Sequence, residues 1–137
     1  MRLVDDRQRR MLQGMTHLQS RRGEAAEQLA ADYLQTHGLE VVARNLRCRA
    51  GELDLVCLDA GVLAVIEVRQ RGCRDFGGAL YSVTWRKRRR IIRAARYFLA
   101  TRAEWRTRAL RFDVFAVEGH LQGAQQIYWI KDAFRAT

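Results

Sequence analysis

Two short acidic stretches joined by a tight turn signal constrain the fold of this chain more than any other feature. The first reads Gly-Glu-Leu-Asp-Leu-Val over residues 51–56, and the second reads Val-Ile-Glu-Val-Arg over residues 65–69. Residues 59–62, Asp-Ala-Gly-Val, lie between apolar runs and predict a β-hairpin with a two-residue loop. We therefore expect two adjacent antiparallel strands.

The register of this predicted hairpin brings two carboxylates face to face. Pairing across the two-residue loop places Asp54 opposite Glu67. Like charges in that position, with Cβ atoms about 5 Å apart, repel each other and destabilise a sheet unless a positive charge lies between them. A divalent cation bound by Asp54 and Glu67 fits this arrangement. The same register places Glu52 opposite Arg69, where a simple cross-strand ion pair is an equal alternative to a role in the site.

Two alternatives to a metal site stay open at this point. The facing acids could be strand-end carboxylates in solvent or in salt bridges. Alanine is also a poor occupant of a turn position that needs a positive φ, so a three-residue loop with a bulge at Gly61 would shift the facing pair.

Length and composition exclude several classes of protein. The chain has 137 residues, 48% of them hydrophobic, which predicts a single domain. Residues 1–19 are polar, arginine-rich and aperiodic and predict a flexible basic N-terminal extension, so the domain covers residues 20–137. No stretch reaches the roughly 18 apolar residues of a membrane span, and the N-terminal segment lacks the apolar centre of a secretory signal. We expect a cytoplasmic protein with no membrane partner. The three cysteines show no close pairing and predict free thiols, with Cys57 packed as a small apolar residue.

Positive charge is concentrated in one segment. The net charge is +10, and between Arg86 and Arg111 there are eleven basic residues and one acid, Glu104. This concentration is typical of proteins that bind a polyanion, although a solvated helix face is the common alternative. The candidate nucleic-acid-binding residues in or beside this segment are Lys87, Arg71, Arg86, Arg89, Arg90 and Arg93.

Hydrophobic periodicity predicts an α/β fold. We expect helices over residues 20–37 and, after a Thr84 cap, to about residue 101; strands over residues 39–48, 52–58, 62–71, 110–117 and 126–130; and a loop over residues 72–82. The third strand begins with a continuous apolar run, which suits a strand covered on both faces. A sheet between helices follows.

Several motifs are spread along nearly the whole domain. They are GEAA at 23–26, RNLR at 44–47, GELDLV at 51–56, EVRQR at 67–71, the stretch 83–90 with Lys87, RFDV at 111–114 and IKDAF at 130–134. Together they resemble the YraN-type family of small bacterial proteins, which are predicted endonucleases of the restriction-endonuclease-like superfamily and similar to archaeal Holliday-junction resolvases.

This resemblance implies an α/β, restriction-endonuclease-like fold, with a mixed central sheet of about five strands flanked by helices. It implies a metal-dependent endodeoxyribonuclease that uses Mg²⁺ or Mn²⁺ to hydrolyse the phosphodiester bonds of DNA, branched or damaged DNA included. In the family pattern, Asp54 and Glu67 are the catalytic metal ligands, and Glu24 is the additional acid from a helix. Gln70 and Glu52 are accessory candidates. Resolvase-like enzymes commonly work as dimers, so a homodimer is also an expectation.

The signature residue Arg69 departs from the family pattern, which usually has lysine there. Arginine supplies positive charge but does not act as a base, because its pKa stays above about 12. We rank three interpretations: Arg69 is a working electrostatic substitute, Lys87 takes over, or the nuclease is weakened or inactive and still binds nucleic acid. A non-catalytic nucleic-acid-binding module is therefore the alternative function. A protein-interaction domain for an acidic partner is a weaker third.

Two further observations concern residues outside the acidic pair. Asp113 lies in an apolar strand, where a buried structural ion pair is the favoured interpretation. Trp85, Trp105 and Trp129 could stack on bases, but tryptophans in a domain of this size are more often part of the core.

Overall fold

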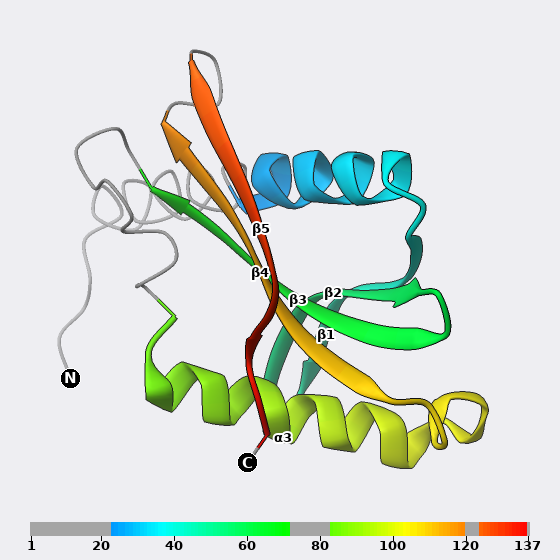
Figure 1. The fold of residues 1–137 in the computed structure, drawn as a ribbon. Coiled ribbons are helices and arrows are strands. Elements are labelled where there is room, and N and C mark those ends of the chain that lie inside the picture. The colour runs from blue at the N-terminus through cyan, green and yellow to red at the C-terminus, as the bar shows by residue number, and fades with distance from the viewer. Residues whose placement is uncertain (1–22, 72–82, 120–123, 137) are drawn as a thin grey trace, which may run out of the picture.

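The computed structural model describes residues 23–71, 83–119 and 124–136 (Figure 1). Its elements are an N-terminal helix over residues 23–36, β1 (Glu40–Cys48), β2 (Gly51–Asp59), β3 (Val62–Arg71), α3 (Trp85–Thr101), a short 3₁₀ helix (Ala103–Trp105), β4 (Leu110–Gly119) and β5 (Gln125–Phe134). The predicted extension over residues 1–19 and the predicted loop over residues 72–82 lie outside the described residues.

The strands form one mixed sheet in the order β1-β2-β3-β4-β5. β1, β2 and β3 pair antiparallel, β3 and β4 pair parallel, and β4 and β5 pair antiparallel. A parallel pair needs a crossover connection, and α3 lies in the connection between β3 and β4. This α/β architecture confirms the predicted fold class and is consistent with a restriction-endonuclease-like scaffold.

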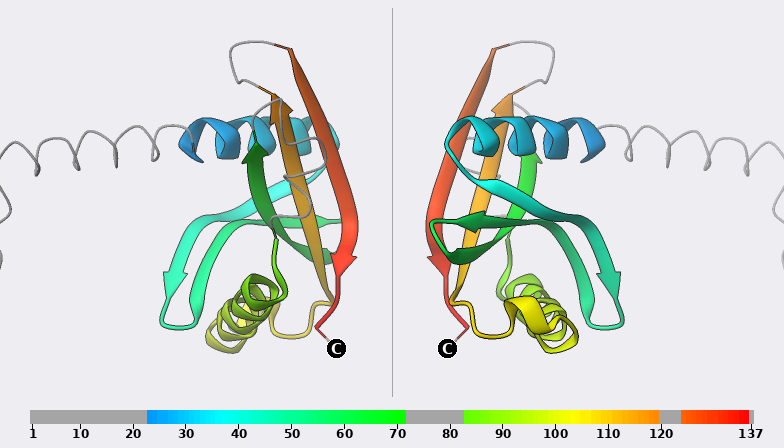
Figure 2. Two further views of the ribbon diagram at one scale, coloured as in Figure 1. Left: turned by 90° about the vertical axis from the view of Figure 1, so that its left-hand side faces the viewer. Right: turned by 90° about the vertical axis from the view of Figure 1, so that its right-hand side faces the viewer.

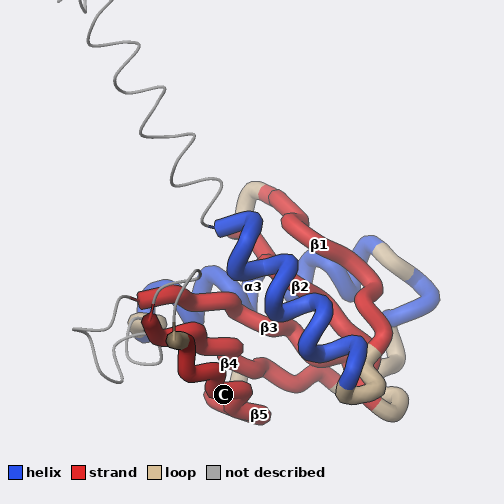
Figure 3. The backbone as a smooth tube through the Cα atoms, turned by 90° about the horizontal axis from the view of Figure 1, so that it is seen from above, coloured by secondary structure: helices blue, strands red, loops and turns tan. Residues whose placement is uncertain are grey.

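The sheet is covered on both faces (Figure 2). The N-terminal helix packs on one face through a core that includes Ala30, Leu34 and Ile66. α3 packs on the other face through a core that includes Ile91, Phe98 and Val65, and it runs alongside β1 and β2 (Figure 3). Consecutive residues of β3 therefore enter opposite cores, as its continuous apolar run predicted.

The hairpin between β2 and β3 forms as the sequence predicted. Ala60 and Gly61 are the two loop residues, and both have positive φ, 48° and 89°. This is the geometry of a two-residue turn that matches the twist of the flanking strands, and no bulge shifts the register. Asp59 pairs with Val62, and the same register continues toward the acidic stretches.

Helix α3 starts where its cap residue predicts. The Thr84 side chain accepts a hydrogen bond from the backbone N–H of Lys87 at 3.2 Å, so the first turn of the helix is fixed. Cys57 is buried in the core as predicted, and burial raises the pKa of its thiol to about 12. No helix among the described residues is long and apolar enough to cross a membrane.

Candidate active site

The pairing of β2 with β3 changes at the acidic stretches. The paired register runs from Asp59 and Val62 to Leu55 and Ile66. At the next position, the carboxylate Oδ2 of Asp54 accepts a hydrogen bond from the backbone N–H of Val68 at 2.9 Å. A side-chain carboxylate thus takes the place of a backbone acceptor, and it holds Asp54 in a fixed position against β3.

The carboxyl groups of Asp54 and Glu67 meet. Their side chains are hydrogen-bonded to each other, and Glu67 is only 3% exposed. Burial, and then the charge of Asp54, raise the pKa of Glu67 to about 8, even though its contact with Lys87 acts in the opposite direction. The predicted convergence of these two acids is present in the structure, and their local environment disfavours two negative charges.

Two cations approach Glu67 from different elements. The Nζ atom of Lys87 lies 2.7 Å from Glu67 Oε1, and the Nη1 atom of Arg69 lies 3.7 Å from the same oxygen. Lys87 stands in the first turn of α3, where the Thr84 cap fixes the backbone. The ammonium of Lys87 is therefore the nearer cation, while Arg69, in the signature position, lies beside it on β3.

Glu27, on the N-terminal helix, is a site residue that the sequence reasoning missed. Burial raises the pKa of its carboxyl, and the next largest cause is the charge of Asp54, so the two acids interact electrostatically. A signal was available in the sequence. Glu27 falls at helical spacing from the buried Ala30, Ala31 and Leu34, so it is an acid in the core-facing stripe of the helix.

Asn45 connects Glu27 to the strands. Its side chain hydrogen-bonds the Glu27 carboxyl, and its backbone has a φ of 49°. Asparagine tolerates this left-handed conformation better than most residues. The regular pairing of β1 with β2 omits Asn45 and Asp54, although it includes their neighbours on both sides. Both strands continue through this position in the same register, so the omitted pair marks the acidic site without interrupting the sheet.

The other predicted acids lie at the margin of this cluster. Glu24 is exposed, and its charge is the smallest cause acting on the pKa of Glu27. Glu52 does not pair with Arg69 as the hairpin register predicted. It pairs with Arg47 on β1, with Arg47 Nε 3.6 Å from Glu52 Oε1, because the β2–β3 pairing ends at Leu55 and Glu52 stays on the β1 side. That part of the prediction was wrong.

Basic residues extend from the cluster along β3 and α3. Gln70 and Arg71 are half-buried at the end of β3, where they pair with Val117 and Glu118 of β4. On α3, the residues predicted to bind nucleic acid beyond Lys87 are all exposed: Arg86, Arg89, Arg90 and Arg93. The acidic cluster therefore lies at the start of a helix with a positively charged outer face.

The carboxylates of the cluster are a limited set of donors for a metal ion. The described residues contain no group of three His, Cys, Asp or Glu side chains positioned to hold one. The pair of Asp54 and Glu67 nevertheless offers adjacent hard oxygen donors of the kind that Mg²⁺ and Mn²⁺ prefer, in a setting that disfavours their double negative charge. Two protein carboxylates fit Mg²⁺, which usually keeps several waters.

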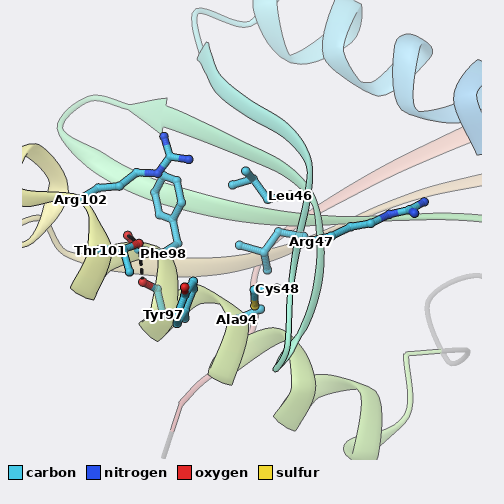
Figure 4. Close-up of a pocket in the computed structure, with 9 residues that line it drawn as sticks. Leu46, Arg47, Cys48, Ala94, Tyr97, Phe98, Thr101 and Arg102 are labelled. Atoms are coloured by element: carbon cyan, nitrogen blue, oxygen red, sulfur yellow. Dashed lines mark hydrogen bonds between the residues drawn. The ribbon is translucent and has the colours of Figure 1, made fainter.

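A cavity of about 100 Å³ lies elsewhere, between β1 and the second half of α3 (Figure 4). Leu46, Cys48 and Phe98 are among its lining residues, and the Arg102 guanidinium lies over the Phe98 ring, 4.7 Å from its centroid. None of the acidic side chains of the cluster lines this cavity. It is separate from the candidate active site.

The fold and the carboxylate pair define a class: an α/β protein whose scaffold is consistent with that of restriction-endonuclease-like proteins. The chain belongs to the uncharacterised protein family UPF0102, whose family model matches residues 26–117. This confirms the YraN-type resemblance that the motifs indicated.

Similar proteins from several bacteria cover most of the chain. A UPF0102 protein of Pseudomonas putida (strain F1) is 47% identical over 115 residues, which are 84% of this chain and 94% of the relative. One from Halorhodospira halophila is 46% identical over 114 residues, 83% and 87% of the two chains. One from Pseudomonas fluorescens (strain Pf-5) is 41% identical over 124 residues, 90% and 98% of the two chains.

Proposed function

We propose that this protein is a metal-dependent endonuclease that hydrolyses the phosphodiester bonds of DNA. The observation that carries the proposal is the contact between the Asp54 and Glu67 carboxyl groups, with Lys87 beside them at the start of a basic helix. A metal-dependent nuclease needs a cation site, a positive group near the reacting phosphate and a surface for the polyanion. All three requirements have candidate residues within this one region.

In this proposal, Asp54 and Glu67 hold a Mg²⁺ or Mn²⁺ ion. Such an ion supplies Lewis-acid stabilisation of the charge that develops on the phosphoryl oxygens. The backbone N–H of Val68 keeps Asp54 oriented, and Asn45 does the same for Glu27. Glu27 adds a third carboxyl at the edge of the pair and can contribute through water.

The roles of the two cations follow from their chemistry and distances. Lys87 is an amine, so it can orient water by hydrogen bonding and can also exchange a proton, which the guanidinium of Arg69 does not do. Its Nζ atom is also the nearer one to Glu67, at 2.7 Å against 3.7 Å for Arg69. We therefore assign to Lys87 the task of orienting water and exchanging a proton. We assign to Arg69 the electrostatic stabilisation of the phosphate.

One observation favours a second candidate function, a nucleic-acid-binding module without catalysis. The Lys87 ammonium already compensates Glu67 through its 2.7 Å ion pair, and the described residues provide no third metal donor in place. Such a module would bind DNA with an affinity that falls steeply as salt rises, and it would cleave nothing with any divalent metal.

A cleavage assay separates the two candidates. Duplex, single-stranded and four-way-junction DNA are incubated with Mg²⁺ or Mn²⁺ and either the wild-type chain or the Glu67→Gln variant. We expect cleavage by the wild type and its loss in Glu67→Gln, with DNA binding retained or strengthened because a negative charge is removed. The matched control is Glu40→Gln, which removes the same charge from the exposed start of β1.

The outcomes of this assay are distinct. Cleavage by wild type and Glu40→Gln, and none by Glu67→Gln, supports the nuclease. Binding without cleavage in all three proteins supports the second candidate. Cleavage that is equal in wild type and Glu67→Gln rules out the assignment of this site.

A further inference from the structure

Trp85, the first residue of α3, is exposed to solvent to an unusual degree. It is 71% exposed, more than the other large hydrophobic side chains among the exposed described residues, Tyr97 at 57% and Tyr128 at 41%. Trp105 and Trp129 are half-buried and pack against the two cores, as expected for tryptophans in a small domain. Trp85 departs from that expectation, so its exposure needs a separate explanation.

The exposed indole is held by a neighbouring arginine. The guanidinium carbon of Arg89 lies over the Trp85 ring, 4.8 Å from its centroid, as residues four apart on a helix can. A guanidinium stacked over one face leaves the opposite face of the ring as the open surface. The pair is thus a flat aromatic surface with a fixed positive charge on one side.

The position of this pair links it to the candidate active site. Trp85 precedes Lys87 by two residues, and Lys87 Nζ contacts Glu67 Oε1 at 2.7 Å. The two residues therefore share the first turn of the helix, whose backbone the Thr84 cap fixes. Positions two apart on a helix point about 200° from each other, so the indole lies on the outer side of this turn and the Lys87 ammonium on the side of the sheet.

The neighbours of the ring indicate the kind of ligand that it suits. A protein partner that buries a tryptophan would usually find further apolar side chains around it. Here the exposed neighbours are Arg86, Arg89 and Arg90. A planar aromatic ring within a set of arginines matches a polyanion that carries flat rings, and base stacking on aromatic residues is a standard mode of single-stranded nucleic-acid binding.

We propose that Trp85 and Arg89 form a stacking platform for an unpaired nucleobase on the outer face of the helix turn whose inner side carries Lys87. This inference rests on the proposed function, and it adds the substrate class: nucleic acid with an unpaired nucleotide near the cleaved position but separated from it by the width of the helix, in a single-stranded segment or at a branch. Bases inside a continuous duplex are already stacked on each other and would have to be extruded at a cost. The platform therefore adds no binding affinity for continuous duplex DNA.

Binding measurements without cleavage test this inference. Fluorescence anisotropy in EDTA gives the Kd of a single-stranded oligonucleotide and of the same sequence as a duplex. The proteins are wild type, Trp85→Ala, Trp85→Phe and Tyr97→Ala, an exposed aromatic on the same helix about three turns away. A second oligonucleotide carries the fluorescent base aminopurine, which reports stacking directly.

We expect Trp85→Ala to weaken single-strand binding by about tenfold, the usual effect of losing one base stack, and to leave duplex binding nearly unchanged. Trp85→Phe should retain most of the affinity, and Tyr97→Ala should match the wild type. Aminopurine fluorescence should be quenched by wild type and not by Trp85→Ala. Circular dichroism checks that each variant is folded.

The binding results separate a failure of the stacking platform from a failure of the proposed function. If wild type binds neither oligonucleotide, the proposed function fails and the platform fails with it. If wild type binds both, and Trp85→Ala weakens neither or weakens both equally, only the platform is overturned. An unchanged aminopurine signal in Trp85→Ala also overturns it, and would leave a protein partner as the reason for the exposed indole.

Discussion

Two buried carboxylates on neighbouring strands, Glu67 on β3 and Asp113 on β4, have opposite surroundings. Glu67 pairs in register with Val114, in the core beneath α3, while Asp113 pairs with Ile66, in the core beneath the N-terminal helix. The two acids therefore face opposite sides of one sheet. They are 3% and 0% exposed, so burial is similar and the difference lies in their partners.

Asp113 is surrounded by donors from its own domain. Arg111 donates two hydrogen bonds to it, at 2.8 and 2.9 Å, and the Trp129 indole and the backbone N–H of Asp132 donate one each at 3.0 Å. Arg111 also bonds Asp59 at 2.8 Å and so ties β4 to the β2–β3 turn. The hydrogen bond to Asp113 is the main reason that the pKa of Arg111 is raised. This is the buried structural ion pair that the sequence predicted.

Glu67 has the carboxylate of Asp54 as a neighbour, whereas Asp113 is surrounded by hydrogen-bond donors. The pKa of Glu67 is raised because burial and Asp54 outweigh the contact with Lys87. Buried structural acids are usually paired and fully hydrogen-bonded, whereas acids with strongly perturbed pKa values cluster at functional sites. Asp113 therefore stabilises the fold through its own partners, whereas Glu67 has the surroundings that the proposed function requires.

The largest expected effect is on stability, at Asp113. Asp113→Ala should lower the free energy of unfolding by about 3 to 5 kcal/mol, because it leaves the Trp129 and Asp132 N–H groups without an acceptor and leaves the Arg111 guanidinium with Asp59 as its remaining partner. Glu67→Gln should lower it by less than about 1 kcal/mol, because it removes the repulsion from Asp54. Urea unfolding at constant pH measures both. An equal loss of stability in the two variants would contradict the different roles assigned to Asp113 and Glu67.

The next effect concerns the two cations beside Glu67. Lys87→Ala should lower the rate of DNA cleavage by about a hundredfold or more, the usual effect of removing a group that positions or transfers a proton. Arg69→Ala should have the smaller effect on this rate, since we assign it only electrostatic stabilisation. Single-turnover cleavage with saturating protein separates the chemical step from binding. An Arg69→Ala effect larger than that of Lys87→Ala would reverse the assigned roles.

A smaller effect is the pH dependence of stability in the metal-free protein. The pKa of Glu67 is raised from 4.5 to about 8 on folding, so between these values the folded state binds more protons than the unfolded state. The free energy of unfolding should therefore fall as pH rises through this window, with a slope on the order of 1 kcal/mol per pH unit. Thermal unfolding in EDTA from pH 5 to pH 8 measures the slope.

Variants sharpen this pH prediction. Glu67→Gln should flatten the slope, because no titrating carboxyl is left at that position. Added Mg²⁺ should raise the melting temperature more at pH 8 than at pH 5, where protons compete for the same oxygens. A slope that is identical in wild type and Glu67→Gln would assign the pH dependence to other groups.

The sequence predicted the parts of this structure that depend on local rules. The Ala60-Gly61 turn and its register, the Thr84 cap and the continuous apolar run of β3 follow from short-range preferences, and the structure contains all three. The register brings Asp54 and Glu67 to adjacent positions just beyond the last paired residues, where their side chains meet. The structural role of Asp113 could be predicted because an acid in an apolar strand needs partners.

The parts that could not be predicted depend on tertiary geometry. The hairpin register extrapolated to Glu52 failed because the β2–β3 pairing ends at Leu55 and Ile66. The left-handed conformation of Asn45 within β1, opposite Asp54, depends on the surrounding structure, since asparagine in a strand is usually extended. The 2.7 Å contact of Lys87 with Glu67 arises only when α3 packs on the sheet.

Manganese binding followed by isothermal titration calorimetry, without DNA, tests the central claim most directly. The wild-type chain, Glu67→Gln and the control Glu40→Gln are titrated at pH 7.5. The account predicts saturable binding of Mn²⁺ by wild type and Glu40→Gln, and its loss in Glu67→Gln. Wild-type protein that binds no Mn²⁺, or Glu67→Gln that binds it as tightly as the wild type, would contradict the assignment of the carboxylate pair as a cation site.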